Sequence, residues 1–81
     1  MKVTIRFFAS MQDAAGVPML KVDVREGATT SDVLEEVYRQ FPQLEKYRTS
    51  CRSALNQDYL TEVVPVSDGD ELALIPPTSG G

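Results

Sequence analysis

The sequence predicts an α+β fold in which a mixed β-sheet packs on one main helix. Segments of alternating apolar and polar residues, typical of strands, lie near both ends of the chain, and one amphipathic stripe with helical spacing lies between them. The chain has 81 residues, of which 42% are hydrophobic and 25% are charged, so it has room for one packed core. We therefore expect a single domain over residues 1–75 and an extended tail over residues 76–81.

Two strands are expected before the main helix. Their apolar residues alternate with polar ones: Val3, Ile5 and Phe7 within residues 2–8, and Leu20, Val22 and Val24 within residues 20–24. Residues 9–16 are rich in Ala, Met and Gln, which favours a short helical turn before Gly16. The two strands should therefore form a β-hairpin with a long connection.

The main helix is expected to begin at Thr29 or Thr30, since either side chain can act as the N-cap. It should end near Phe41, because Pro42 disfavours helical geometry in the residue before it. Its apolar stripe consists of Val33, Leu34, Val37, Tyr38 and Phe41. We interpret this stripe as core, and we expect a short turn to follow it through Leu44 and Tyr47.

Two further strands are expected after the helix. The first covers residues 52–56, and the chain is expected to be irregular from there to the turn Asp68-Gly69-Asp70, with Pro65 interrupting a strand-like run. The last covers residues 71–75, with Leu72 and Leu74 facing inward. Because its other residues include Ala73 and Ile75, it is apolar on both faces and should lie in the middle of the sheet.

The composition excludes several kinds of site. The chain has no histidine and a single cysteine, Cys51, so it lacks the ligands for a zinc site or an iron–sulfur cluster and the partners for a disulfide or a histidine-based triad. Its glycines match neither dinucleotide-binding nor P-loop spacing. The acidic turn at residues 68–71 invites a calcium interpretation, but Leu72 and Ala73 stand where a ligand and a glycine are required. We expect no metal site.

The acidic residues are concentrated in the last third of the chain. Residues 53–81 contain five acidic and no basic residues, whereas residues 1–52 contain eight basic and seven acidic ones. Because an acidic surface repels phosphate groups, nucleic acid and anionic membranes are poor partners, and a basic protein surface is a better one. The sequence also contains no signal-peptide pattern and no membrane-spanning run, so we expect a cytoplasmic location.

The chain closes with two prolines and four small residues: Pro76, Pro77, Thr78, Ser79, Gly80 and Gly81. The prolines favour an extended path, and at about 3.3 Å per residue six residues reach roughly 20 Å. A Gly-Gly end has no Cβ atoms and can enter a narrow channel, and its α-carboxylate is ionised at neutral pH. Taken alone, these residues are equally compatible with an ordinary frayed terminus.

Three segments closely resemble the small subunit of molybdopterin synthase, of the MoaD and ThiS type of sulfur carriers. They are Ala-Leu-Asn-Gln-Asp-Tyr-Leu at residues 54–60, the acidic turn, apolar strand and Pro-Pro-Thr-Ser-Gly-Gly end at residues 68–81, and Val-Thr-Ile-Arg-Phe-Phe-Ala at residues 3–9. The resemblance implies a β-grasp fold, the ubiquitin-like arrangement, which agrees with the expected element order.

The resemblance also implies a role for the tail. An E1-like adenylyltransferase of the MoeB type would use ATP to adenylate the carboxylate of Gly81, and a sulfur donor would convert it to a thiocarboxylate. The large subunit of molybdopterin synthase would then transfer the sulfur to cyclic pyranopterin monophosphate, in molybdenum cofactor biosynthesis. In this scheme the chain is a non-catalytic co-substrate with no permanently bound cofactor, and two small subunits assemble on a dimer of large ones.

The same resemblance assigns roles to individual residues. Gly81 would carry the sulfur, and Pro76, Pro77, Thr78, Ser79 and Gly80 would thread into the partner. Candidates for an apolar patch that docks on partners are Phe8, Leu60 and Ile75, each of which could equally belong to the core. The family often has basic residues where this chain has Ser-Met-Gln-Asp at residues 10–13.

Three alternatives stay open. The chain could carry sulfur for another pathway, such as thiamine thiazole, cysteine or tRNA thiolation. It could instead be a ubiquitin-like interaction module whose Gly-Gly is unused or conjugated to lysines. Cys51 could be a sulfur carrier itself, although with no histidine to activate it a structural role is favoured.

Overall fold

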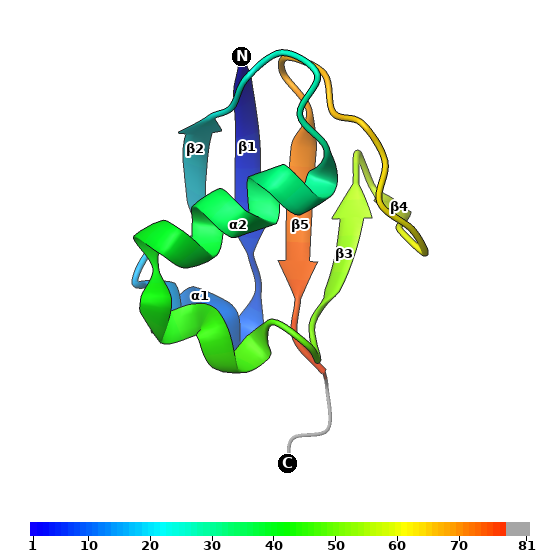
Figure 1. Ribbon diagram of the computed structural model, residues 1–81. Helices are drawn as coiled ribbons and strands as arrows, with labels where there is room; N and C mark the ends of the chain where they lie inside the picture. Colours follow the sequence, from blue (N-terminus) through cyan, green and yellow to red (C-terminus); the bar gives the residue numbers. More distant parts are fainter. Residues whose placement is uncertain (78–81) are drawn as a thin grey trace.

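The computed structural model describes residues 1–77 of the chain. It contains five strands, two α-helices and one 3-10 helix (Figure 1). In chain order these are β1 (Lys2–Phe7), α1 (Ala9–Ala15), β2 (Met19–Asp23), α2 (Thr30–Gln40), η1 (Pro42–Tyr47), β3 (Arg52–Leu55), β4 (Asp58–Tyr59) and β5 (Glu71–Ile75).

The five strands form one mixed sheet with the order β2-β1-β5-β3-β4. The last strand lies at the centre, parallel to β1 and antiparallel to β3, as its two apolar faces predicted. The hairpin of β1 and β2 is antiparallel, and α1 forms its long connection. The helices lie together on one side of this sheet (Figure 1). This is the β-grasp arrangement, so the expected fold is confirmed.

The core lies between the sheet and α2. The most deeply buried side chains include Val3, Ile5 and Phe7 from β1, Val33 and Val37 from α2, and Leu72 and Leu74 from β5. At roughly 25 cal/mol per Å² of apolar surface, each of these side chains contributes about 1.5–3 kcal/mol to folding. Leu34 and Phe41, at the edges of the helix stripe, are only partly buried.

The start of α2 is fixed by a capping box. The backbone N–H of Asp32 donates to Thr29 Oγ1 at 3.4 Å, and the backbone N–H of Thr29 donates to Asp32 Oδ2 at 2.9 Å. These two bonds satisfy backbone donors that a helix start otherwise leaves unpaired. The N-cap is thus Thr29, one of the two residues predicted, and the helix ends before Phe41 and Pro42 as expected.

The expected irregular segment after Asn56 is the main correction to the predicted fold. Asp58 and Tyr59 form a two-residue edge strand, β4, on the outside of β3. Pro65 makes an isolated antiparallel bridge with Thr29, so the proline-containing run is tied to the entry of α2. So short a strand has too few residues for an alternating pattern, and nothing in the local sequence marks it.

Two smaller differences concern strand ends. The first strand ends at Phe7, so Phe8 follows it as the N-cap residue of α1. The third strand ends at Leu55 and leaves Asn56 to the turn before β4. None of the helices within residues 1–77 is long and apolar enough to cross a membrane.

Candidate functional site

The C-terminal segment leaves the body at the end of the central strand. Ile75 is the last residue of β5, Pro76 is buried against the body, and Pro77 is exposed. The first proline is therefore anchored, and the second lies at the surface. Thr78, Ser79, Gly80 and Gly81 lie outside the described residues, so their roles in threading and sulfur transfer stay predictions.

An apolar surface flanks this exit on the side of the sheet opposite the helices. This surface extends over four strands. Cross-strand pairing sets Arg6 beside Ala73, Ala73 beside Ala54, and Ala54 beside Tyr59. A shallow hollow of about 310 Å³ lies here. It is lined by Arg6, Phe8, Ala54, Gln57, Tyr59, Glu71, Ala73 and Ile75. We call this hollow and its lining residues the outer face.

Large exposed side chains make the outer face suitable for protein docking. Phe8 is 40% exposed and Tyr59 is 56% exposed, although both rings belong to types that cores normally bury. Contiguous exposed apolar residues of this kind mark interaction sites more often than scattered ones do. The outer face therefore has the composition of a binding surface and lies directly beside the exit of the tail.

Cations lie over both exposed rings. The Arg6 guanidinium lies 5.8 Å from the centre of the Phe8 ring, and that of Arg52 lies 4.4 Å from the centre of the Tyr59 ring. Arg6 also pairs with Glu71 at 3.6 Å. The outer face is thus framed by arginines in a chain whose net charge is −4. Carboxylates on a partner would complement this frame.

The structure brings two of the three predicted patch residues together. Phe8 and Ile75 both line the outer face, whereas Leu60 packs against the core and lines a different hollow. The position predicted for Leu60 is occupied by its neighbour Tyr59. Within a strand successive side chains point to opposite faces, so the unrecognised strand β4 concealed which of the two residues points outward.

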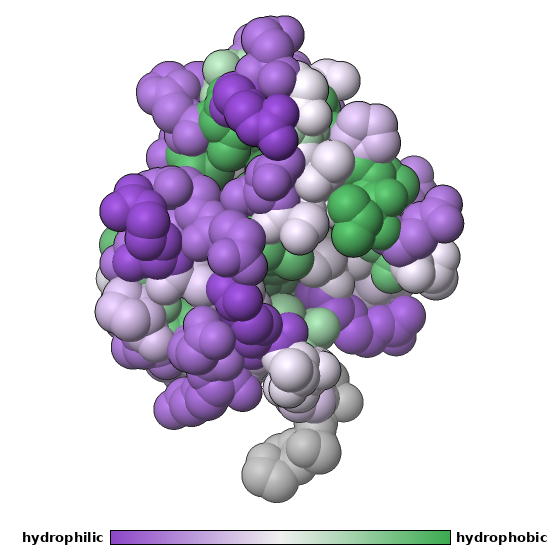
Figure 2. All heavy atoms as spheres, in the orientation of Figure 1, coloured by the Kyte–Doolittle hydropathy of each residue, from purple (hydrophilic) through white to green (hydrophobic). Residues whose placement is uncertain are grey.

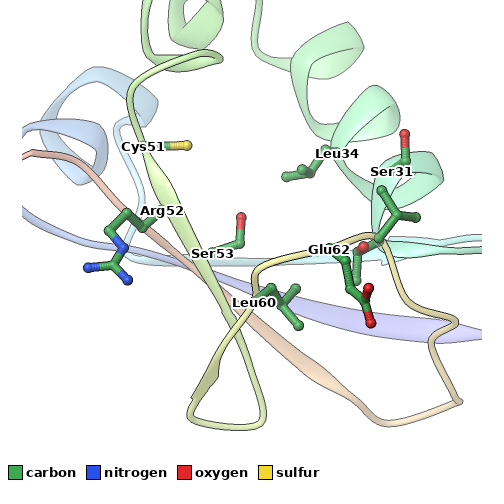
Figure 3. Close-up of a pocket in the computed structure, with 9 residues that line it drawn as sticks. Ser31, Leu34, Cys51, Arg52, Ser53, Leu60 and Glu62 are labelled. Atoms are coloured by element: carbon green, nitrogen blue, oxygen red, sulfur yellow. The ribbon is translucent and has the colours of Figure 1, made fainter.

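A second hollow, of about 320 Å³, lies between α2 and β3. In Figure 3 the side chains of Leu34, Cys51 and Ser53 point into it from α2 and from the beginning of β3. Figure 2 views this helix-covered side, which is mainly hydrophilic with separate hydrophobic areas. Val63, which lines the second hollow, is 61% exposed. Within residues 1–77, no hydrogen bond joins the thiol, hydroxyl and carboxylate groups that line this hollow into a nucleophile–base pair.

Cys51 lies at the inner edge of this second hollow. Its Sγ is 3.4 Å from the hydroxyl of Tyr38, and its side chain packs against the core. Burial, followed by this contact, raises the pKa of Tyr38 well above 10. Of the two arginines near Cys51 in sequence, Arg48 stacks at 4.7 Å on Tyr38, whose hydroxyl contacts Cys51, and Arg52 stacks on Tyr59.

The acidic turn before β5 is a structural element. Asp68 Oδ1 accepts the backbone N–H of Lys2 at 2.7 Å, and Asp70 Oδ2 accepts that of Ser67 at 2.7 Å. Gly69 has a φ of 87°, a left-handed conformation that glycine adopts without strain. No group of side chains in the part of the chain that the structure describes is suited to hold a metal ion. The aspartates are used to hold the turn against β1.

Fold and site together define a ubiquitin-like protein with an exposed apolar face beside the end of its last strand. Comparison with known proteins agrees with this ubiquitin-like class. The ThiS family model matches residues 5–81. The molybdopterin synthase sulfur carrier subunit of Arabidopsis thaliana is 40% identical over 99% of this chain and 83% of its own length. The chain belongs to the ThiS family and, within it, to the molybdopterin synthase sulfur carrier subunits.

Solved structures show the same fold. The structure of SAMP1 from Haloferax volcanii matches with a TM-score of 0.90 and 30% identity, and covers the whole of both chains. A protein–protein complex of subunits 1 and 2 of the molybdopterin-converting factor from Helicobacter pylori matches over the whole of both chains with a TM-score of 0.72 and 24% identity. At that identity the second likeness concerns the fold alone.

Proposed function

We propose that this chain carries sulfur on Gly81 for molybdopterin synthase. Its family membership is the observation that carries the proposal. The position of the outer face beside the end of β5 supports it, because a partner that receives the tail within its reach of roughly 20 Å can also contact this face. The chain then acts as a co-substrate, and the chemistry takes place in its partners.

The proposed chemistry begins with the carboxylate of Gly81. An E1-like adenylyltransferase joins it to the α-phosphate of ATP, and pyrophosphate leaves. A sulfur donor at the oxidation level of sulfide then displaces AMP, so that a carbon–sulfur bond replaces the carbon–oxygen bond to phosphate. The resulting thiocarboxylate supplies sulfur to cyclic pyranopterin monophosphate, and two such deliveries provide both sulfurs of the dithiolene. No cofactor is bound permanently to the carrier in this scheme.

The outer face is proposed to dock on the large subunit. Phe8 and Ile75 keep their predicted roles, and Tyr59 joins them in place of Leu60. The surface is continuous with the tail, since Ile75 is two residues from the end of the described chain. The Helicobacter pylori protein of like fold is in a complex of subunits 1 and 2, which is in keeping with such a pairing. We propose a cytoplasmic heterotetramer with two copies of each subunit.

A second candidate function is protein modification. It is favoured by the likeness to SAMP1, a small archaeal modifier protein, at 30% identity over the full length of both chains. In that role the activated Gly81 would form an amide bond with a lysine of a target protein. Both functions begin with activation of the same carboxylate and differ in the acceptor.

Blocking the C-terminus tests the proposed role of Gly81. A variant with one alanine added after Gly81 is mixed with the large subunit, the activating enzyme, ATP, a sulfur donor and the pterin substrate, and molybdopterin is measured. We expect no molybdopterin, while binding to the large subunit is retained. Formation of molybdopterin at the rate of the unmodified chain would contradict the proposal.

A further inference from the structure

The turn between β3 and β4 has an unfavourable residue for its backbone geometry. Asn56 and Gln57 form a two-residue hairpin loop, and both have positive φ, 50° and 75°. Positive φ at both central residues is the mark of a type I′ turn, for which Asn-Gly is the preferred sequence. Glutamine has a Cβ atom and is not among the residues that tolerate this conformation well, so Gln57 is strained where a glycine would not be.

Asn56, the other residue of the turn with a positive φ, has hydrogen bonds that explain its conformation. Asn56 Nδ2 donates to Asp70 Oδ1 at 3.1 Å, and the backbone N–H of Glu71 donates to Asn56 Oδ1 at 3.0 Å. The backbone N–H of Asn56 donates to the carbonyl of Glu71 at 2.8 Å. These bonds fasten the hairpin to the beginning of β5, so Asn56 has a structural role that offsets its strain.

Gln57 has no comparable structural role. Within residues 1–77 its carboxamide makes no hydrogen bond, and the residue is exposed. Its side chain instead lines the outer face together with Phe8, Tyr59 and Ile75. Strain that folding does not explain is found most often at functional positions. The strained conformation of Gln57 places its carboxamide, which has no hydrogen-bond partner within residues 1–77, at the margin of the outer face.

We propose that Gln57 is a contact residue of the outer face, whose carboxamide hydrogen-bonds to main-chain polar groups of the large subunit. This inference rests on the proposed function. Arg6 of the outer face and Arg52 over the Tyr59 ring are suited to carboxylates, whereas a carboxamide donates and accepts at once and so matches the N–H and C=O of an exposed backbone segment. A polar contact at the rim of an apolar centre is the usual arrangement of a protein interface.

The test separates stability from binding. Replacing Gln57 with glycine (Gln57→Gly) removes both the strain and the carboxamide, so the melting temperature should rise by about 4–8 °C, as expected for a domain of this size. The dissociation constant for the large subunit should increase about 5- to 100-fold, the effect of losing two hydrogen bonds between uncharged groups. A gain in stability together with a loss of binding is the result that supports the inference.

Two further variants separate the role of Gln57 from the role of the outer face as a whole. Gln40→Ala removes an exposed carboxamide from α2, on the other side of the sheet, and should leave binding unchanged. Tyr59→Ala removes a large part of the outer face and should weaken binding at least 10-fold, as interface tyrosines commonly do.

If Tyr59→Ala weakens binding and Gln57→Gly does not, the inference about Gln57 is wrong and the docking role of the outer face stands. If both variants bind like the unmodified chain, the outer face is not the docking surface, and the inference fails with it. A melting temperature of Gln57→Gly at or below that of the unmodified chain would contradict the strain argument. None of these outcomes bears on whether Gly81 carries sulfur, which the C-terminal block tests separately.

Discussion

Tyr59 and Leu60 are neighbours in sequence and serve different purposes. Tyr59 is exposed on the outer face, whereas Leu60 is partly buried, and its backbone N–H donates to the carbonyl of Ser53 at 2.9 Å. We predict that Leu60→Ala lowers the free energy of unfolding by about 1–2 kcal/mol, less than for a fully buried leucine. Urea denaturation measures this change. Binding to the large subunit should stay the same, and a 10-fold loss of affinity in a folded Leu60→Ala would restore this residue to the docking surface.

Tyr38 gives the protein a dependence on alkaline pH. Its pKa is raised in the folded state by burial and by the contact with Cys51, so the folded state favours the protonated phenol. The resulting stability is fully present below pH 10, the ordinary value for tyrosine, and is lost as the pH rises above it. We predict that the melting temperature falls between pH 10 and 11 and that Tyr38→Phe reduces this fall. An equal fall in both proteins would show that Tyr38 is not the cause.

At the scale of elements, the start of α2 depends on one side chain. Thr29 makes the capping box with Asp32, and the backbone hydrogen bond from Thr29 is the main cause of the lowered pKa of Asp32. We predict that Thr29→Ala lowers the free energy of unfolding by about 1 kcal/mol, whereas Thr29→Ser keeps nearly all of it. Denaturant titration of both variants is the measurement. Equal stability of Thr29→Ala and the unmodified chain would show that the cap contributes nothing.

The elements with strong local patterns were predictable from the sequence. The stripe of α2, its cap and the proline after it lie within one continuous segment, and so does the alternation in β1. β4 was not predicted, because its two residues, which pair with Ala54 and Leu55 across a two-residue turn, are too few to show an alternating pattern. Pro65 differs, because its bridge to Thr29 joins segments far apart in the chain. Local sequence does not report a pairing of that kind.

At the scale of the whole molecule, the sheet separates two tasks. One side packs on the helices (Figure 1) and holds the core. The other presents the outer face beside the end of β5. The parallel pairing of β1 with β5 sets Arg6 beside Ala73 and brings Phe8, from the start of the chain, to the outer face together with Ile75. In a chain whose net charge is −4, Arg6 and Arg52 lie over the two exposed rings, a placement that the net charge alone did not show.

The candidate site was only partly predictable from the sequence, because the sequence does not show which side of the sheet a residue faces. Family resemblance pointed to the tail, and Phe8, Leu60 and Ile75 were predicted as patch residues although nothing in the sequence showed which side of the sheet each one faces. Tyr59 and Gln57 became candidates only when the hairpin geometry was known, since one depends on the face of a strand and the other on a positive φ. The sequence signal that could have pointed to Gln57 is a glutamine directly after an asparagine, where a type I′ turn prefers glycine.

The most direct test of the sulfur-carrier proposal is the intact mass of the untagged protein after incubation with ATP, a competent activating enzyme and a sulfur donor. We predict a mass gain equal to the replacement of one oxygen by one sulfur, localised to Gly81 by fragmentation, and no gain when ATP is omitted. An unchanged mass, obtained with an activating enzyme that thiocarboxylates a known carrier in the same experiment, would contradict the proposal that this chain carries sulfur.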